Sequence, residues 1–119
     1  MSKENPSIDW KSLESEEALQ QAISESSEHP VVIFKHSTSC SISSMAKSRL
    51  ESGWNSEEVN DARPYYLDLL SNRNISNLVA QTLGVVHESP QILILKDGKC
   101  VYNTSHMGIS FEGVKRQFS

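Results

Sequence analysis

Two cysteines, Cys40 and Cys100, are the residues of this sequence best suited to covalent chemistry. Two thiols are too few for a disulfide-stapled scaffold, and 119 residues are enough to fold around a hydrophobic core without one. A free thiol reacts as its thiolate, and its ordinary pKa of about 8.5 leaves it mostly protonated at neutral pH. A reactive cysteine must therefore lie where its surroundings favour the thiolate.

Cys40 has such a position in the sequence. The run 31–34 consists of β-branched and aromatic residues, which is typical of a strand buried on both faces. Residues 36–39 predict a polar turn, and helical periodicity starts at Cys40. The free amides of a helix N-terminus favour an anion, and Lys35 and His36 could add positive potential. The alternative for Cys40 is a buried cysteine that fills space in the core. The alternative for His36 is a solvated histidine in the turn.

The elements around Cys40 follow from apolar spacing, caps and turn dipeptides. Ser15 and Ser110 are placed as N-caps, Gly84 as a helix stop, and Asp97-Gly98 as a hairpin turn. We expect helices at 15–27, 40–53, 71–84 and 110–118, strands at 31–34, 65–70, 92–95 and 100–103, and an irregular tail over 1–9 or a short edge strand before the first helix. Strands that alternate with helices indicate parallel pairing, and the last two strands indicate an antiparallel hairpin. The chain is therefore predicted to be a single α/β domain with a mixed central sheet.

The segment 34–43, which reads Phe-Lys-His-Ser-Thr-Ser-Cys-Ser-Ile-Ser, resembles the active-site segment of the monothiol bacilliredoxins, the YtxJ-like branch of the thioredoxin superfamily. Ser89-Pro90-Gln91, the strand after it, and Gly108 before the last helix match the layout of the same family. The resemblance extends from about Trp10 onward and implies a thioredoxin-like three-layer sandwich. It departs at Ser41, where members of the family carry a proline.

The resemblance implies roles for several residues. Cys40 would be the nucleophile, and Ser89 with a cis-Pro90 would lie beside it and pair with the backbone of an incoming peptide or small thiol. Gly108 would reach the same end of the sheet, where a side chain would crowd the substrate. The candidates for binding the substrate or tuning the thiolate are Lys35, His36, Ser39, Ser43, Ser89, Pro90 and Gly108.

A single thiol limits the chemistry. Dithiol oxidoreductases place a resolving cysteine three positions after the nucleophile, and that position holds Ser43, which can hydrogen-bond a thiolate but cannot form a disulfide. Cys100 is the other candidate, but the predicted strand 91–96 takes the chain on the order of 20 Å away from Pro90 before the hairpin turn. Because a disulfide needs Cα atoms within about 7 Å, Cys100 is predicted to be a structural or peripheral thiol.

We therefore expect monothiol exchange at Cys40, which removes a low-molecular-weight thiol of the bacillithiol type from protein mixed disulfides. The small thiol is a co-substrate, and no bound cofactor is expected. The expected partners are S-thiolated client proteins, the small thiol, and a dithiol redoxin or reductase that regenerates Cys40. Two other classes stay open: a module resembling monothiol glutaredoxins that binds an iron–sulfur cluster or a thiol, and a redox-inactive adaptor of the same fold.

Charge and composition also bear on other classes of function, namely nucleic-acid binding, membrane spanning and metal binding. A net charge of −4 argues against nucleic-acid binding, and no apolar run is long enough to span a bilayer. His87, Glu88 and His106 lie on loops predicted to border the site, but no fixed spacing among them indicates a metal site. Because no signal peptide follows Met1, we expect a cytoplasmic protein without nucleic-acid or membrane partners.

Overall fold

The computed structural model describes residues 10–37, 41–54, 62–105 and 108–118. Helices and strands alternate through most of the chain, as the periodicity predicts. In order they are β1 (Lys11–Ser12), α1 (Glu16–Glu25), β2 (Val31–His36), α2 (Ser41–Gly53), β3 (Arg63–Asp68), α3 (Arg73–Leu83), β4 (Gln91–Lys96), β5 (Lys99–Ser105), α4 (Phe111–Lys115) and a short 3₁₀ turn, η3 (Arg116–Phe118).

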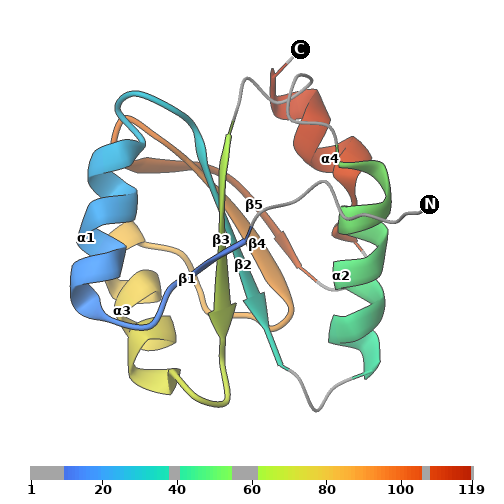
Figure 1. Ribbon diagram of the computed structural model, residues 1–119, viewed down its shortest axis with the longest axis horizontal. Coiled ribbons are helices and arrows are strands. Elements are labelled where there is room, and N and C mark those ends of the chain that lie inside the picture. The colour runs from blue at the N-terminus through green and yellow to red at the C-terminus, as the bar shows by residue number, and fades with distance from the viewer. Residues whose placement is uncertain (1–9, 38–40, 55–61, 106–107, 119) are drawn as a thin grey trace.

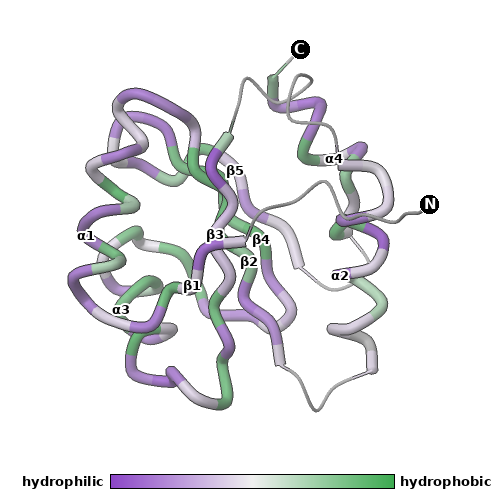
Figure 2. The backbone as a smooth tube through the Cα atoms, in the orientation of Figure 1, coloured by the Kyte–Doolittle hydropathy of each residue, from purple (hydrophilic) through white to green (hydrophobic). Residues whose placement is uncertain are grey.

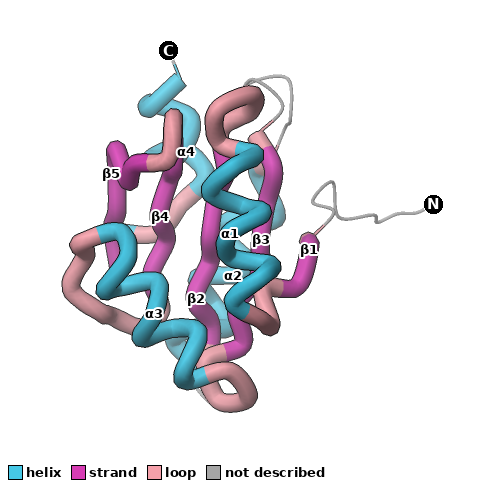
Figure 3. Tube along the Cα trace, turned by 90° about the vertical axis from the view of Figure 1, so that its left-hand side faces the viewer, coloured by secondary structure: helices cyan, strands magenta, loops and turns pink. Residues whose placement is uncertain are grey.

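The strands form one five-stranded mixed sheet in the order β1-β3-β2-β4-β5. Helices α1 and α3 cover one face of the sheet and α2 and α4 cover the other (Figure 1). The view turned by 90° shows α1 and α3 in front of the strands (Figure 3). This arrangement confirms the predicted three-layer sandwich with a C-terminal antiparallel hairpin.

Parallel pairing is restricted to one half of the sheet. β3 runs parallel to both β1 and β2, whereas β4 runs antiparallel to β2, with Lys35 opposite Gln91. Alternation of strands and helices by itself favours parallel pairing for β4, whereas the resemblance, which places Pro90 at the Cys40 end of the sheet, implies the antiparallel direction that is observed. The segment between α3 and β4 returns the chain to the end of the sheet at which β3 finished, so β4 starts where β2 ends.

Two hydrophobic clusters lie on opposite faces of the sheet, because successive strand residues point to opposite sides. The first joins the sheet to α2 and α4 and includes Phe34, Leu50 and Ile94. The second joins it to α1 and α3 and includes Ile33 and Leu93. Figure 2 shows hydrophobic stretches in the central strands, while α1 and α3 alternate between hydrophobic and hydrophilic residues. The continuous apolar runs of β2 and β4 are thus explained by burial on both faces.

The predicted caps and turn are confirmed. Ser15 and Ser110 accept hydrogen bonds from the amides of Ala18 and Gly113, each at 3.1 Å. Gly84 ends α3 with φ +67°, and Asp97 and Gly98 form the hairpin turn with φ +52° and +78°, the left-handed pair that a tight hairpin needs. The longest described helix has 13 residues, and none in the described part of the chain is long and apolar enough to cross a membrane.

Several predicted boundaries and faces are wrong. β2 continues through Lys35 to His36, which the sequence places in the turn 36–39, because the side chain of His36 finds buried partners. Ser71, the first residue of the helix expected at 71–84 and by its type a candidate N-cap, lies in the preceding turn and donates to Asp68. Asn72 is the N-cap residue of α3. Helical spacing in the sequence places Met45 on the same apolar face of α2 as Ala46 and Leu50, but its side chain is 59% exposed. Helical spacing also places Thr82 on the apolar stripe of α3 with Ile75 and Val79, but Thr82 is exposed. The strand expected at 65–70 spans 63–68.

Candidate active site

The candidate site lies at the end of the sheet where β2 finishes and α2 and β4 begin. Cys40 and Ser39 lie outside the described residues. The chain leaves β2 at His36 and resumes at Ser41, the first residue of α2, so the predicted position of Cys40 directly before a helix agrees with the bounds of α2. The other candidates are described, and their contacts define what this end of the sheet can do.

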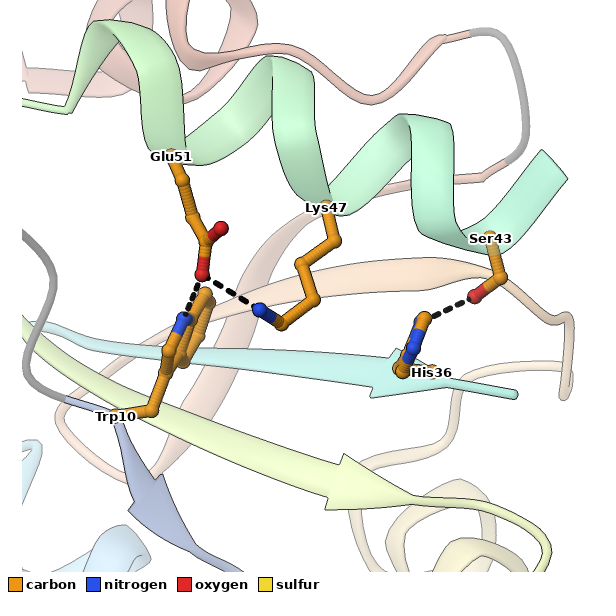
Figure 4. A network of polar contacts seen from close by, with 5 residues as sticks. All are labelled: Trp10, His36, Ser43, Lys47 and Glu51. Carbon is orange, nitrogen blue, oxygen red and sulfur yellow. Dashed lines mark hydrogen bonds and ion pairs between the residues drawn. The ribbon is translucent and has the colours of Figure 1, made fainter. Parts of the chain in front are cut away.

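Ser43 joins the first turn of α2 to the end of β2. Its Oγ lies 2.7 Å from Nδ1 of His36 and accepts a hydrogen bond from the amide of Ser37 at 3.1 Å. Figure 4 shows the His36 ring facing Ser43 across the gap between β2 and α2. Ser43 and His36 are both buried. The hydroxyl therefore links the first turn of α2 to the end of β2.

His36 belongs to an aromatic cluster and is not solvated. Its ring stacks on Phe34 with centroids 5.6 Å apart and lies 5.4 Å from the ring of Tyr66. Burial lowers the pKa of His36, the Lys47 ammonium lowers it further, and Asp68 with other groups opposes the shift. His36 is therefore neutral at pH 7. The expectation that it supplies positive potential is wrong, and so is the alternative of a solvated turn histidine.

Neutral His36 leaves two arrangements for the Ser43 hydroxyl. When Nδ1 carries no proton, Ser43 donates its hydrogen to the ring. When Nδ1 carries the proton, Ser43 accepts from both His36 and Ser37, and its own hydrogen is free for another acceptor. The tautomer of His36 thus controls whether Ser43 can donate a hydrogen bond to a neighbouring thiolate.

A second polar contact secures α2 against the N-terminal strand. Glu51 Oε2 accepts from Nε1 of Trp10 and from Nζ of Lys47, each at 2.7 Å (Figure 4). Nζ of Lys47 also lies 5.8 Å from the centre of the Tyr66 ring. The i,i+4 spacing of Lys47 and Glu51 can be found in the sequence, but the approach of Trp10 from 41 residues away cannot.

Lys35 lies on the opposite side of the sheet from α2. Its side chain is fully buried, and its Nζ donates to the carbonyl of Ser76 at 3.3 Å and to Nδ1 of His87 at 3.2 Å. Burial lowers the pKa of Lys35 to about 8. The ammonium is thus directed at α3 and the following loop. The expectation that Lys35 adds potential on the side of α2 is not supported by this placement, and Ser76 is a partner that sequence reasoning missed.

The Ser89–Pro90 peptide bond is cis, as the resemblance implies. Pro90 is buried and Ser89 is half-buried at the start of β4. Buried Gln91 holds the preceding residues, because its side chain donates to the carbonyl of Val86 at 3.0 Å and accepts from the amide of Glu88 at 3.4 Å. Ser89 and Pro90, here called the Ser89–Pro90 edge, therefore lie directly before β4 and next to the end of β2.

Gly108 is exposed after β5. A Cβ at this position would clash with the hydroxyl of Thr104. The missing side chain therefore relieves a contact inside the protein, which is a different reason from the crowding of a substrate that the sequence suggests.

Cys100 lies near the hairpin end of the sheet, opposite Leu95, whereas Gln91 at the other end of β4 pairs with Ser105. Cys100 and Ser105 are five residue steps apart along β5, a distance of about 17 Å. Burial raises the pKa of the Cys100 thiol, and its Sγ donates to the carbonyl of Tyr102. The predicted separation of Cys100 from the Pro90 end is confirmed, and its thiol is poorly suited to act as a nucleophile.

The described residues contain no group of three or more His, Cys, Asp or Glu side chains arranged to hold a metal ion. His106, one of the loop residues considered for such a site, lies outside them. His87 contacts Lys35 and Ser76.

Comparisons with known proteins agree with this arrangement. The family model of the monothiol bacilliredoxin BrxC matches residues 11–114. A solved structure with a thioredoxin fold, proposed to be an oxidoreductase, is 30% identical with a TM-score of 0.78, over 90% of this chain and 91% of that one.

Two thioredoxins show the same fold at lower identity. That of Trypanosoma brucei brucei has 16% identity and a TM-score of 0.71, over 98% of this chain and 94% of its own. That of Fasciola hepatica has 17% identity and a TM-score of 0.69, over 91% and 95%. This chain has a thioredoxin fold and belongs to the monothiol bacilliredoxin family of thiol–disulfide oxidoreductases.

Proposed function

We propose that this protein removes a low-molecular-weight thiol of the bacillithiol class from mixed disulfides on client proteins, through Cys40 alone. The observation that carries the proposal is the hydrogen-bonded Ser43, which occupies the position of a resolving cysteine. Cys100, at the hairpin end of the sheet, is too remote from the Pro90 edge to take over that role. Membership of the monothiol bacilliredoxin family supports the same reaction class.

The reaction is a thiol–disulfide exchange in two steps. The Cys40 thiolate attacks the small-thiol sulfur of the client's mixed disulfide, a new S–S bond forms, and the client leaves as a thiolate that takes up a proton. Cys40 then carries the small thiol. A second small-thiol thiolate, or a dithiol redoxin or reductase, attacks this disulfide and releases Cys40.

The described residues supply position and protonation rather than a second thiol. Ser43 ties the first turn of α2 to β2, and the free amides at the N-terminus of α2 would favour a thiolate at Cys40. The tautomer of His36 sets the direction of the Ser43 hydroxyl and would thereby decide whether Ser43 can donate to a Cys40 thiolate. Ser89 and Pro90 would offer the backbone edge to the incoming disulfide.

Intact mass spectrometry tests the proposal after incubation with bacillithiol disulfide and, separately, glutathione disulfide. Cys100→Ser is expected to gain one small-thiol adduct, whereas Cys40→Ser gains none. The disulfide that reacts faster identifies the preferred carrier. Loss of the adduct in Cys100→Ser, or its persistence in Cys40→Ser, would contradict a single active thiol.

The same preparations test the two alternatives. A shared iron–sulfur cluster predicts visible absorption and a dimer, and a colourless monomer contradicts it. A redox-inactive adaptor predicts a Cys40 pKa near 8.5 or above, measured from the pH dependence of alkylation by iodoacetamide, whereas an exchanger predicts a lowered pKa.

A further inference from the structure

Lys35 is a buried ammonium with neutral partners. In the part of the chain that the structure describes, its Nζ donates to the carbonyl of Ser76 and to Nδ1 of His87. Burial and then the Lys35 charge lower the pKa of His87, so its ring is neutral and can accept this hydrogen bond at pH 7. Ser76 Oγ lies 3.3 Å from the same Nδ1. Three groups from β2, α3 and the loop after α3 therefore meet at one point.

Burial of a charged amine at this position is energetically unfavourable. Lys35 has no exposed surface, and burial lowers the pKa of its amine. A methionine would fill a similar volume without a buried charge, and replacing buried charges with apolar side chains is often neutral or stabilising. Packing and global stability therefore do not explain the amine, but its hydrogen bonds can.

The hydrogen bonds of Lys35 help to fix the segment Val85–Ser89, which directly precedes Pro90. Lys35 holds it at His87, and Gln91 holds it at Val86 and Glu88. Lys35 and Gln91 are opposite each other in the pairing of β2 with β4, so the two anchors act from neighbouring positions of the sheet. The residues between α3 and Pro90 are thereby attached at three consecutive positions.

We propose that Lys35 is a positioning residue: with Ser76 and His87, it holds the Val85–Ser89 segment so that the Ser89–Pro90 edge is ordered before a disulfide substrate arrives. This inference rests on the proposed function for its effect on exchange. Its geometry differs from thiolate tuning, because the ammonium lies on the face of the sheet opposite α2. The expected consequence is faster exchange without any change in the reactivity of the Cys40 thiol itself.

Two rates measured on Lys35→Met separate these roles. The rate constant for exchange with a protein–bacillithiol mixed disulfide is expected to fall on the order of tenfold to a hundredfold, because misplacing groups that orient a substrate is costly. The rate and pH profile of Cys40 alkylation by iodoacetamide, which needs no backbone edge, should stay unchanged. Lys99→Met, an exposed lysine at the hairpin turn, is the control for the loss of one positive charge.

Exposed His87 provides a second pair of variants that should leave folding intact. His87→Gln keeps an acceptor for Lys35 and is expected to retain most of the exchange rate, whereas His87→Leu removes the acceptor and should behave like Lys35→Met. Unchanged exchange in both Lys35→Met and His87→Leu would overturn the proposal. A shifted alkylation pH profile in Lys35→Met would also overturn it, in favour of thiolate tuning.

Amide hydrogen exchange tests the segment independently of the proposed function. In Lys35→Met and His87→Leu, the amides of residues 85–89 should exchange faster than in the wild type and in Lys99→Met, while those of β2 stay protected. Failure of the wild type to react with any mixed disulfide would contradict the proposed function. Unchanged protection of residues 85–89 would contradict the positioning role, whatever the wild type's activity.

Discussion

Lys35 and His36 are consecutive residues of β2, yet their side chains enter opposite layers of the molecule. His36 packs with Phe34 and bonds to Ser43 on the α2 side, and Lys35 bonds to Ser76 on the α3 side. The alternation of a strand separates two side chains that the sequence shows as one basic pair. Because His36 is neutral and Lys35 is directed toward α3, a Cys40 thiolate would be favoured instead by the N-terminus of α2 and the Ser43 hydroxyl.

Ser43→Ala is expected to lower the free energy of unfolding by about 1–3 kcal/mol, because His36 Nδ1 and the Ser37 amide both lose a buried hydrogen-bond partner. Urea denaturation measures the change. Ser44→Ala, one residue further along α2 and exposed, is the matched control and should stay within about 0.5 kcal/mol of the wild type. Equal losses in the two variants would show that the Ser43 hydroxyl has no special role in stability.

The lowered pKa of Lys35 makes stability depend on pH in a defined direction. Between pH 8 and 10.5 the unfolded chain holds the Lys35 proton and the folded chain does not, so this residue increases stability as pH rises through that window. Below it, burial of the charge destabilises the fold by on the order of 3 kcal/mol.

Lys35→Met should therefore be more stable than the wild type at pH 7. This advantage should shrink steadily toward pH 10, because the wild type loses its buried charge over that range. Urea unfolding of both proteins at several pH values measures the difference, in which other titrating groups cancel. A difference that does not vary with pH would contradict a Lys35 pKa near 8.

At the scale of elements, α2 is held at both of its ends. Ser43 bonds its first turn to β2, and Glu51 in its last turn accepts from Trp10 next to β1, while Lys47 joins Glu51 from the middle. The strand that precedes Cys40 and the helix that follows it are therefore fastened to each other. Such rigid flanking elements would place a nucleophile reproducibly against a substrate edge.

The charges of this helix should be visible in the titration of His36. Lys47→Met is expected to raise the pKa of His36, because the Lys47 ammonium is the largest cause of its lowering after burial. Glu51→Gln should lower it, because the carboxylate acts in the opposite direction. NMR titration of the ring protons measures both shifts, with Lys99→Met as the control. Shifts of the same sign in the two helix variants would contradict this electrostatic assignment.

At the scale of the whole molecule, the sheet separates two cores that share β4. Leu93 and Ile94 are neighbours in the chain and fully buried, but Leu93 packs with the α1–α3 cluster and Ile94 with the α2–α4 cluster. The candidate site lies at one end of this sheet and Cys100 lies near the other. Both helical layers therefore depend on the same central strand.

Leu93→Ala and Ile94→Ala are each expected to lower the free energy of unfolding by about 2–5 kcal/mol, because each leaves a cavity in a different core. Val101→Ala on β5 is the control, since this side chain is 53% exposed and should cost little. Thermal or urea unfolding measures all three variants. A loss confined to one of the two core variants would show that the two faces of β4 do not contribute comparably.

Local signals in the sequence are sufficient to predict the helices and strands and several helix caps. The apolar runs of β2 and β4, the serines at 15 and 110, and the left-handed pair Asp97-Gly98 each express a preference decided within a few residues. The ends of elements were less predictable. His36 is polar enough to indicate a turn, but it continues β2 because Ser43 and Tyr66 give its ring a buried place.

The sequence by itself determined the α/β class, the order of its elements, and a single thiol before a helix with serine where a resolving cysteine would stand. These features depend on residue types at short spacing. Only the tertiary structure decided the partners of Lys35 and His36 and the contact between Trp10 and Glu51. The reason is that a buried polar group needs a partner, and that partner here comes from 7, 41 or 52 positions away, where no local pattern indicates it.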